Sequence, residues 1–235
     1  GRRLRRPFRV RVEPRRDTTH VMSRSDYRSQ GSHGVGLAAE AIPALTFFRE
    51  WLRNPFAMAA VSPSGRQLAG LMVEQLPPHT QRVIELGGGT GAFTRALLDS
   101  GIAPRHLLVI ELNESLHRLL SGRFPSVHVE CGDARNVQAI ARRRGVLDEN
   151  GEVDAVVSGL GLLYMPHHVQ REILRAAFAV LGPRGRFVQF TYGPISPVPR
   201  SLLQELDVKA RRAGTAWRNV PPANVFVYQR AKHRA

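Results

Sequence analysis

The stretch Val83–Gly91, Val-Ile-Glu-Leu-Gly-Gly-Gly-Thr-Gly, decides the fold that we predict for this chain. Its first four residues have the pattern of a short buried strand and run directly into a glycine-rich turn. Glycine accepts positive φ and brings the backbone close to a ligand without a Cβ in the way. A helical pattern over 92–100 follows, and its first N–H groups face the same turn. This order is typical of α/β proteins that hold a nucleotide-like ligand at the carboxyl edge of a sheet.

From this stretch onward, apolar strand patterns alternate with helical ones, which is typical of a parallel sheet covered by helices. Strands are predicted at 82–86, 107–111, 126–130, 153–158 and 186–191, and helices at 92–100, 114–122, 135–144 and 169–181. A last strand pair is predicted at 211–217 and 224–229. The fold class is therefore α/β and Rossmann-like, with a seven-stranded, mostly parallel sheet and helices on both faces.

The region before the sheet is predicted to add an amphipathic helical extension. One helix over 45–53 has apolar residues on one face, and a second follows Ser62-Pro63-Ser64 and runs to about Leu76. The domain prediction is a basic arm at 1–42, N-terminal helices at 43–78 and the α/β domain at 79–235.

Acidic side chains follow three successive predicted strands. Glu85 lies at the end of the first, Glu111 ends the second and Asp133 follows the third. A carboxylate in the second position can accept both ribose hydroxyls of an adenosine group, and one in the third lies where the adenine amino group would be. The alternative is that Glu111 and Asp133 only cap the helices that follow them.

Composition limits the choice of partner and compartment. The net charge of +15 and the sequence pI of about 11.5 call for an anionic partner, either nucleic acid or an acidic membrane surface. The lone Cys131 gives no internal disulfide, and no apolar run is long enough to span a bilayer. We expect a cytoplasmic protein.

The first 28 residues hold ten arginines and read as a disordered basic arm. Met22 is followed by a polar run that resembles an ordinary protein N-terminus. The alternative interpretation of residues 1–21 is therefore a mis-assigned start of the protein.

Several motifs together resemble known families. The run 85–91, Glu111, Gly132-Asp133-Ala134 and Ser158-Gly159-Leu160 resembles the class I methyltransferases that use S-adenosylmethionine. The segments 47–55, 62–65 and 189–194 are similar to the bacterial phosphatidylethanolamine N-methyltransferases, with a likeness that covers about 43–230. The resemblance implies S-adenosylmethionine as cofactor and up to three methyl transfers that end in phosphatidylcholine. It implies these cofactor-binding residues: Glu85, Gly87, Gly89, Gly91, Glu111, Leu112, Asp133, Ala134 and Ser158.

The lipid family is related to the ribosomal RNA adenine dimethylases, which makes RNA the competing substrate. Their fourth strand ends in an Asn-Leu-Pro-Tyr type motif that holds a flipped adenine. Here the same place reads Ser158 to Tyr164, without Asn or Pro and with Tyr164 displaced. Gly88 and Gly161 depart from the lipid family, which has other residues there.

Tyr192, at the end of the fifth predicted strand, is our candidate catalytic residue. Its hydroxyl can align the lipid amine or pass the amine's proton to water. The alternative role for Tyr192 is an aromatic that packs under Pro194.

The helix over 45–53 is the candidate membrane contact. Phe48 and Trp51 lie on its apolar face and are flanked by Arg49 and Arg53, the composition of a helix that lies in the plane of an anionic membrane. The alternative is a lid that packs over the cofactor. The predicted partner is thus phospholipid in an anionic membrane, on the inner face of which the protein would be peripheral; no protein partner is predicted and a monomer is expected.

Other chemistries find little support in the sequence. The histidines form no helical metal pair, so no metal site is predicted, and there is no Walker lysine after the glycines. The glycine turn alone also fits NAD, which the wider resemblance argues against. A methyltransferase fold that has lost activity and only binds lipid or RNA is the third hypothesis.

Overall fold

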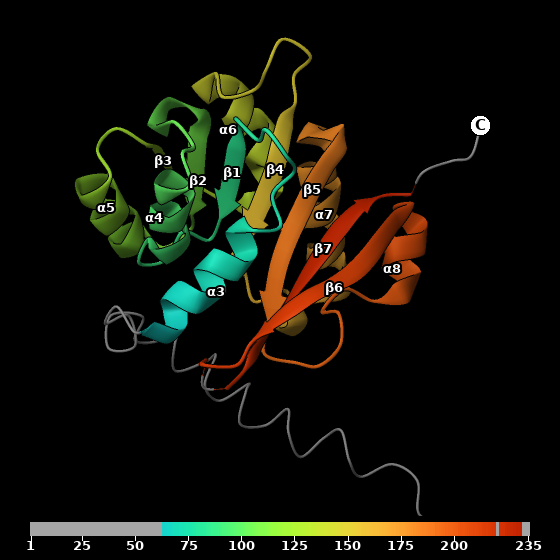
Figure 1. The fold of residues 1–235 in the computed structure, drawn as a ribbon. Helices are drawn as coiled ribbons and strands as arrows, with labels where there is room; N and C mark the ends of the chain where they lie inside the picture. Colours follow the sequence, from blue (N-terminus) through green and yellow to red (C-terminus); the bar gives the residue numbers. More distant parts are fainter. Residues whose placement is uncertain (1–62, 220, 232–235) are drawn as a thin grey trace, which may run out of the picture. The chain divides into compact units, whose positions relative to one another are not determined.

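The computed structural model describes residues 63–219 and 221–231 (Figure 1). Its helices are α3 (Pro63–Val73), α4 (Ala92–Asp99), α5 (Glu114–Arg123), α6 (Val137–Arg144), α7 (His167–Val180) and α8 (Arg200–Glu205). Its strands are β1 (Val83–Leu86), β2 (Leu107–Glu111), β3 (His128–Cys131), β4 (Val153–Ser158), β5 (Leu181–Thr191), β6 (Val208–Ala216) and β7 (Ala223–Arg230). Short 3-10 turns are η1 (Pro104–His106), η2 (Ala134–Asn136) and η3 (Leu162–Tyr164).

The seven strands form one sheet in the order β3-β2-β1-β4-β5-β7-β6. The first five pair in parallel, and β7 pairs antiparallel with both β5 and β6. The strands after β1 are added in one direction as far as β3, and the chain then crosses back to place β4 on the other side of β1. Open α/β sheets bind ligands at the carboxyl ends of the strands on either side of this switch point. The sequence prediction of a seven-stranded, mostly parallel, Rossmann-like sheet is confirmed.

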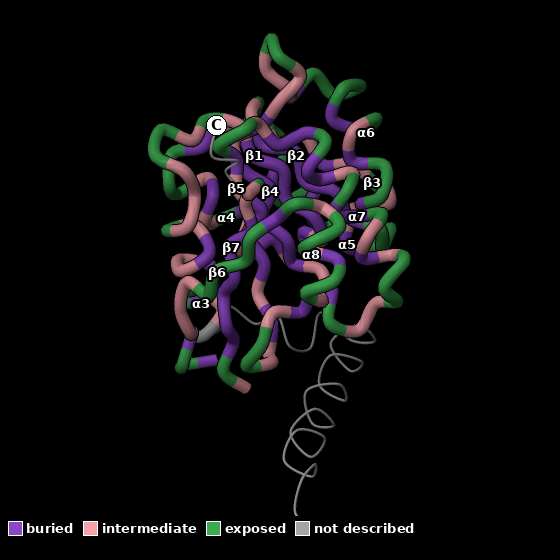
Figure 2. The backbone as a smooth tube through the Cα atoms, turned by 90° about the vertical axis from the view of Figure 1, so that its right-hand side faces the viewer, coloured by how far each residue is buried: buried purple, intermediate pink, exposed green. Residues whose placement is uncertain are grey.

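Alternate side chains of the strands build two apolar layers. On one face, Leu68 of α3, Leu97 of α4 and Leu120 of α5 pack on Val83, Val109 and their neighbours. On the other face, side chains of α6, α7 and α8 pack on Ile84, Ile110 and others of the same strands. The central strands are therefore buried from both sides, as Figure 2 shows.

The observed element bounds differ from the prediction in three informative places. The helix expected at 135–144 is divided into η2 and α6, because Asp133 caps a 3-10 turn at 134–136 before the α-helix begins. The helix expected to end at Leu181 ends at Val180, since Leu181 already pairs with Val153 of β4. The short helix α8 was not expected.

The sequence predictions for the region before α3 lie outside the described residues. These are the basic arm at 1–42, the helix over 45–53 and its candidate membrane contacts Phe48, Arg49, Trp51 and Arg53. Within the part of the chain that the structure describes, no helix has both the length and the apolar content to cross a bilayer.

Candidate functional site

The carboxyl ends of β1 and β4 stand level with each other, and β5 continues past them to Thr191. Leu86 of β1 pairs with Ser158 of β4, which in turn pairs with Gln189 of β5. Two backbone hydrogen bonds lock the turns that follow: Gly159 donates to the Leu86 carbonyl at 2.8 Å and Gly87 donates to the Ile110 carbonyl at 2.8 Å. The turns after β1, β2 and β4 thus meet at one edge of the sheet.

The glycine turn after β1 needs glycine for space and for conformation. Gly87 has φ of 74°, and a Cβ there would lie 2.8 Å from Leu160. Gly91 has φ of 86° and stands at the N-terminus of α4, and a Cβ there would lie 2.4 Å from the Phe124 ring. Both positions are in the left-handed region that side chains rarely adopt. The backbone of this turn is therefore held open toward the strand edge.

Glu111 at the end of β2 is nearly buried and supports the turn. Its Oε2 accepts from the Gly89 N–H at 2.9 Å, and its Oε1 accepts from the Asn113 N–H at 2.9 Å. Each carboxylate oxygen retains a further lone pair for a hydroxyl donor. The N-cap of α5 is Asn113, whose Oδ1 accepts from Ser115 and Leu116, so Glu111 is not the cap of that helix.

A cavity of about 280 Å³ opens beside Glu111. Five of the residues predicted to bind cofactor line it: Gly87, Glu111, Leu112, Asp133 and Ala134. The other lining residues were not among those predicted to bind the cofactor: Ile110, Gly132, Arg135, Leu160, Met165, Val169 and Ile173. Val169 and Ile173 lie one helical turn apart on α7, and this spacing marks an apolar helix face but not the cavity that it covers.

The other predicted cofactor residues do not line the cavity. Gly89 donates to Glu111, Gly91 starts α4, and Ser158 is buried with its Oγ accepting from the Leu160 N–H at 3.3 Å. They shape the turns around the cavity, and Glu85 lies beneath the turn.

Asp133 lines the cavity and also caps η2. Its Oδ1 accepts from the Arg135 N–H at 2.8 Å, and its Oδ2 accepts from the Arg135 guanidinium at 2.7 Å. Hydrogen bonds from Arg135 lower the pKa of Asp133, so the carboxyl group is ionised at neutral pH. Capping and a place in the cavity are therefore combined in this one side chain.

Glu85 is fully buried directly before the glycine turn. Its Oε2 accepts from the Thr94 hydroxyl at 2.6 Å, whereas its Oε1 has no hydrogen-bond partner among the described residues. Burial raises the pKa of Glu85 to about 8; the Thr94 hydrogen bond opposes this rise and the Glu111 charge adds to it. A buried carboxyl with an unsatisfied oxygen suits a neighbouring positive charge.

Gln189 of β5 fixes the turn after β4, and the list of predicted site residues did not include it. Its Nε2 donates to the Leu160 carbonyl at 2.8 Å and to the Phe190 carbonyl at 2.6 Å, and the side chain is fully buried. Leu160 is a wall of the cavity, so Gln189 connects the end of β5 to the cavity lining.

Tyr192, three residues farther along, is half-buried at the same edge. Its ring packs edge-to-face with that of Phe190, with 5.5 Å between the ring centroids. Phe190 packs in the same way on Phe93 of α4, with 5.7 Å between the centroids. The pKa of Tyr192 is raised to about 12 by burial and by the nearby Tyr164, while Asn219 lowers it. Its hydroxyl is therefore neutral at physiological pH and able both to donate and to accept a hydrogen bond.

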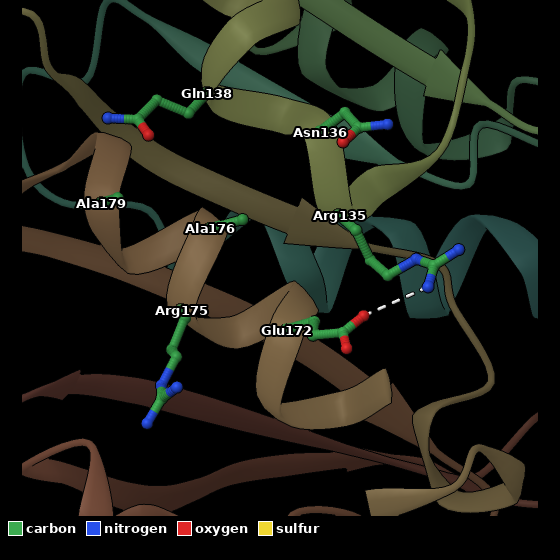
Figure 3. Close-up of a pocket in the computed structure, with 7 residues that line it drawn as sticks. All are labelled: Arg135, Asn136, Gln138, Glu172, Arg175, Ala176 and Ala179. Carbon is green, nitrogen blue, oxygen red and sulfur yellow. Dashed lines mark hydrogen bonds and ion pairs between the residues drawn. The ribbon is translucent and has the colours of Figure 1, made fainter. Parts of the chain in front are cut away.

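A second depression, of about 600 Å³, lies on the surface between η2, α6 and α7 (Figure 3). Arg135 and Glu172 face each other across its rim, with their side chains 3.1 Å apart. This depression is larger than the first cavity but is widely open to solvent. Arg135 is the one residue that lines both. The strand-edge cavity is the one that carries the predicted site residues.

Comparison with known proteins supports this assignment. Residues 83–185 match the family described as "Methyltransferase domain". The chain is 33% identical over 152 residues to an ornithine lipid N-methyltransferase of Singulisphaera acidiphila, a match that covers 63% of this chain and 77% of that relative. It is 33% identical over 97 residues to ribosomal RNA small subunit methyltransferase A of a Synechococcus strain, which covers 39% of this chain and 30% of that relative.

Among solved structures, the chain resembles 1,6-didemethyltoxoflavin-N1-methyltransferase from Burkholderia thailandensis, which was solved with S-adenosylhomocysteine bound. The TM-score is 0.55 at 14% identity, over 86% of this chain and 94% of that one. This likeness concerns the fold.

The chain belongs to the class I methyltransferases that depend on S-adenosylmethionine. Within that class, one of its relatives acts on a lipid amine. The site fits the cofactor, because the cavity at the β2 and β3 ends combines the Glu111 carboxylate with apolar walls, and the unsatisfied oxygen of Glu85 lies beneath the glycine turn. At neutral pH most Glu85 carboxyl groups are protonated, and they ionise readily beside a cation.

Proposed function

We propose that this protein methylates the primary amine of a membrane lipid, with phosphatidylethanolamine as substrate and successive transfers giving phosphatidylcholine. The observation that carries the proposal is the 33% identity to an ornithine lipid N-methyltransferase over 77% of that relative's length. The motifs at 189–194, which resemble the phosphatidylethanolamine family, direct the choice of lipid.

The acceptor side of the edge suits a lipid amine. The turns at 159–166, 192–199 and 217–222 contain no aspartate or glutamate, and the only charged side chain in them is Arg218. These turns therefore form a largely uncharged surface. It is compatible with an apolar substrate whose head group reaches the strand edge.

When bound, S-adenosylmethionine supplies an electrophilic methyl group. Glu111 and Asp133 would hold the adenosine part through their carboxylates, and Gly87 and Gly89, which have no side chain, would let the cofactor approach the backbone of the turn. Tyr192 accepts a hydrogen bond from the amine and orients its lone pair, while the proton of the lipid ammonium leaves to water before transfer. The neutral hydroxyl, with its pKa raised to about 12, is suited to this positioning role.

A peripheral position on the inner membrane face completes the proposal. Phe48 and Trp51 would enter the headgroup region and Arg49 and Arg53 would meet anionic lipid. The protein is proposed to act as a monomer without a protein partner.

RNA adenine methylation is the second candidate, favoured by the 33% identity over 97 residues to a ribosomal RNA methyltransferase. That match covers only 30% of the relative, and the end of β4 reads Ser158-Gly159-Leu160-Gly161 without the Asn and Pro of the dimethylases.

The deciding experiment offers labelled S-adenosylmethionine to the protein with three acceptors: phosphatidylethanolamine in anionic vesicles, ornithine lipid in the same vesicles, and RNA. The expected result is label in mono-, di- or trimethylated phosphatidylethanolamine, absent from a Glu111→Ala control. Label confined to ornithine lipid would keep the lipid reaction and replace the substrate. Label in RNA alone would overturn the proposal, and cofactor binding without any transfer would favour a protein that has lost activity.

A further inference from the structure

The exposed apolar side chains of the described residues are concentrated at one edge of the sheet. Five large ones are exposed in this part of the chain: Leu112 (69%), Leu119 (36%), Leu163 (39%), Ile195 (67%) and Trp217 (72%). Leu119 is on α5, whereas the other four follow the carboxyl ends of β2, β4, β5 and β6. Since exposed apolar groups that gather in one place mark interaction surfaces, this edge needs an explanation.

Three of these side chains belong to turns that touch one another. A Cβ at Gly193 would lie 3.7 Å from Leu163, so the turn after β5 contacts the turn after β4. Asn224 of β7 donates to the Gly193 carbonyl at 2.9 Å and accepts from Thr215 of β6 at 2.7 Å. The side chain of Asn219, in the turn after β6, forms a hydrogen bond with Tyr192. The turns at 159–166 and 192–199 and the described residues of 217–222, which we call the rim turns, thus meet around Tyr192.

The chemistry of the rim turns matches a lipid interface. They contain six prolines and no acidic residue. Proline carries no N–H group, so fewer backbone donors lose water when such a turn enters the headgroup region. Tryptophan is the side chain most typical of that region, because its ring is apolar and its N–H group is polar.

Three exposed arginines lie in or beside the rim turns. Arg218 is in the last rim turn, Arg200 begins α8, and Arg66 lies in α3 beside Gln67, which accepts from the Arg218 N–H at 2.9 Å. All three arginines are exposed. The amino edge of the sheet carries charges of both signs: the acids Glu74, Asp99, Asp148, Glu149, Glu152 and Asp207, and the bases Arg82, Arg105, Arg142, Arg143 and Arg144. An anionic surface is therefore attracted to the rim turns, where exposed arginines are not offset by acidic residues of those turns.

We propose that the rim turns rest on an anionic phospholipid bilayer, with Leu163, Ile195 and Trp217 in the headgroup region and Arg66, Arg200 and Arg218 against lipid phosphates. This surface rests on the proposed function, since it presents Tyr192 directly to lipid amines at the bilayer. It is proposed in addition to the membrane contact that the sequence predicts for 45–53.

The direct measurement uses tryptophan fluorescence of the full chain. The sequence has two tryptophans, Trp51 and Trp217, so Trp51→Phe leaves Trp217 as the only tryptophan emitter. The probe is a vesicle of phosphatidylglycerol and phosphatidylcholine, which contains no primary amine and so reports docking independently of methyl transfer. The expected result is a blue shift of emission on these vesicles that high salt reverses and pure phosphatidylcholine does not produce. Sedimentation with the vesicles without a shift would overturn the proposal, because the chain would then dock by another surface.

A matched pair of variants tests the surface by a second route. Ile195→Ser with Trp217→Ser should lower the partition coefficient onto the anionic vesicles by roughly tenfold or more, whereas Leu119→Ser should leave it unchanged. Unaltered cofactor affinity in each variant shows that the fold is intact. Equal partition of both variants would overturn the proposal even if phosphatidylethanolamine is methylated. A tenfold loss of vesicle partition in the double variant, together with no methylation of phosphatidylethanolamine by the wild type, would support the membrane surface and contradict only the proposed substrate.

Discussion

The Glu111 carboxylate accepts a hydrogen bond from the Gly89 N–H at 2.9 Å, so the side chain that ends β2 holds the turn that follows β1. Its other oxygen holds the first residues after β2 through Asn113. Two neighbouring turns of the cofactor cavity thus depend on one carboxylate. Both turns would be affected by its loss, in addition to any contact with the cofactor.

Glu111→Gln is expected to weaken S-adenosylmethionine binding by tenfold or more in isothermal titration calorimetry. The amide keeps the shape but replaces one acceptor with a donor, which faces the N–H of either Gly89 or Asn113. Glu114→Gln is the matched control, since Glu114 is an exposed residue in the first turn of α5. Equal affinities of the two variants would contradict the role given to Glu111.

Glu85 should make the free energy of unfolding fall with rising pH. Burial raises its pKa from 4.5 to about 8, so the folded chain binds the proton more tightly than the unfolded chain between these values. The associated stability is present below about 4.5, declines as the pH rises and is lost above about 8. In Glu85→Gln this contribution is absent. Denaturant titrations of both proteins across this interval should show a smaller loss of stability for the variant, and parallel curves would argue against the raised pKa.

The same carboxyl group should release its proton when the cofactor binds. At neutral pH most Glu85 side chains are protonated, and a positive charge above the glycine turn favours the ionised form. Calorimetry at pH 7 in buffers of different ionisation enthalpy should give a release of up to about one proton in the wild type. Cofactor binding to Glu85→Gln should release distinctly fewer protons. An identical proton release by the two proteins would show that the proton comes from another group.

Gly88 is predicted to be intolerant of a side chain because of packing. A Cβ there would lie 2.4 Å from Val109 and 2.9 Å from Leu120, so Gly88→Ala should cost about 1–3 kcal/mol of stability. Adding Val109→Ala should recover part of that loss, so that the double variant is more stable than the sum of the single changes implies.

Gly122→Ala is the control, because Gly122 lies on α5 with nothing near its Cβ position. It should leave the melting temperature unchanged or raise it. Additive effects of the Gly88 and Val109 changes in thermal unfolding would show that the contact does not set the cost.

Tyr192→Phe should reduce kcat for the lipid amine by roughly tenfold to a hundredfold while the cofactor affinity stays the same, since one hydrogen bond to the amine is lost. Because the pKa of Tyr192 is about 12, the ratio of the two rates should not vary with pH below about 10. Full activity in the variant would return Tyr192 to the packing role beside Phe190.

The sequence was sufficient for the fold because the strands that bury both faces are short continuous apolar runs with turn residues between them. The runs at 107–111 and 153–158 were predicted with their observed bounds. The start of β5 was missed because Gly182 and Pro183 are stop signals for a helix, and the pairing of Leu181 with Val153 is not visible locally. The helix α8 has six residues, too few for an apolar period to be recognised.

The site was predictable where motifs mark it and hidden where tertiary packing builds it. Glu111 and Asp133 follow strands, and their meeting in one cavity follows from a parallel sheet. Val169 and Ile173 reach the same cavity from α7, which the helix pattern alone does not reveal. Gln189 acts through the carbonyl of Leu160, a contact between residues 29 apart in the chain that has no local signal.

The antiparallel pairing of β7 between β5 and β6 separates the two tasks of the enzyme along the chain. The cavity is lined mainly by residues before β4 ends, whereas the proposed acceptor edge is built largely from the chain after Gln189. If the proposed acceptor edge is correct, changes in the turns after β5 and β6 should alter the choice of acceptor more than the binding of the cofactor. The turn at 159–165 is shared, since Leu160 walls the cavity and Leu163 faces outward. Substitutions in this turn that alter the choice of acceptor should therefore also change the affinity for the cofactor.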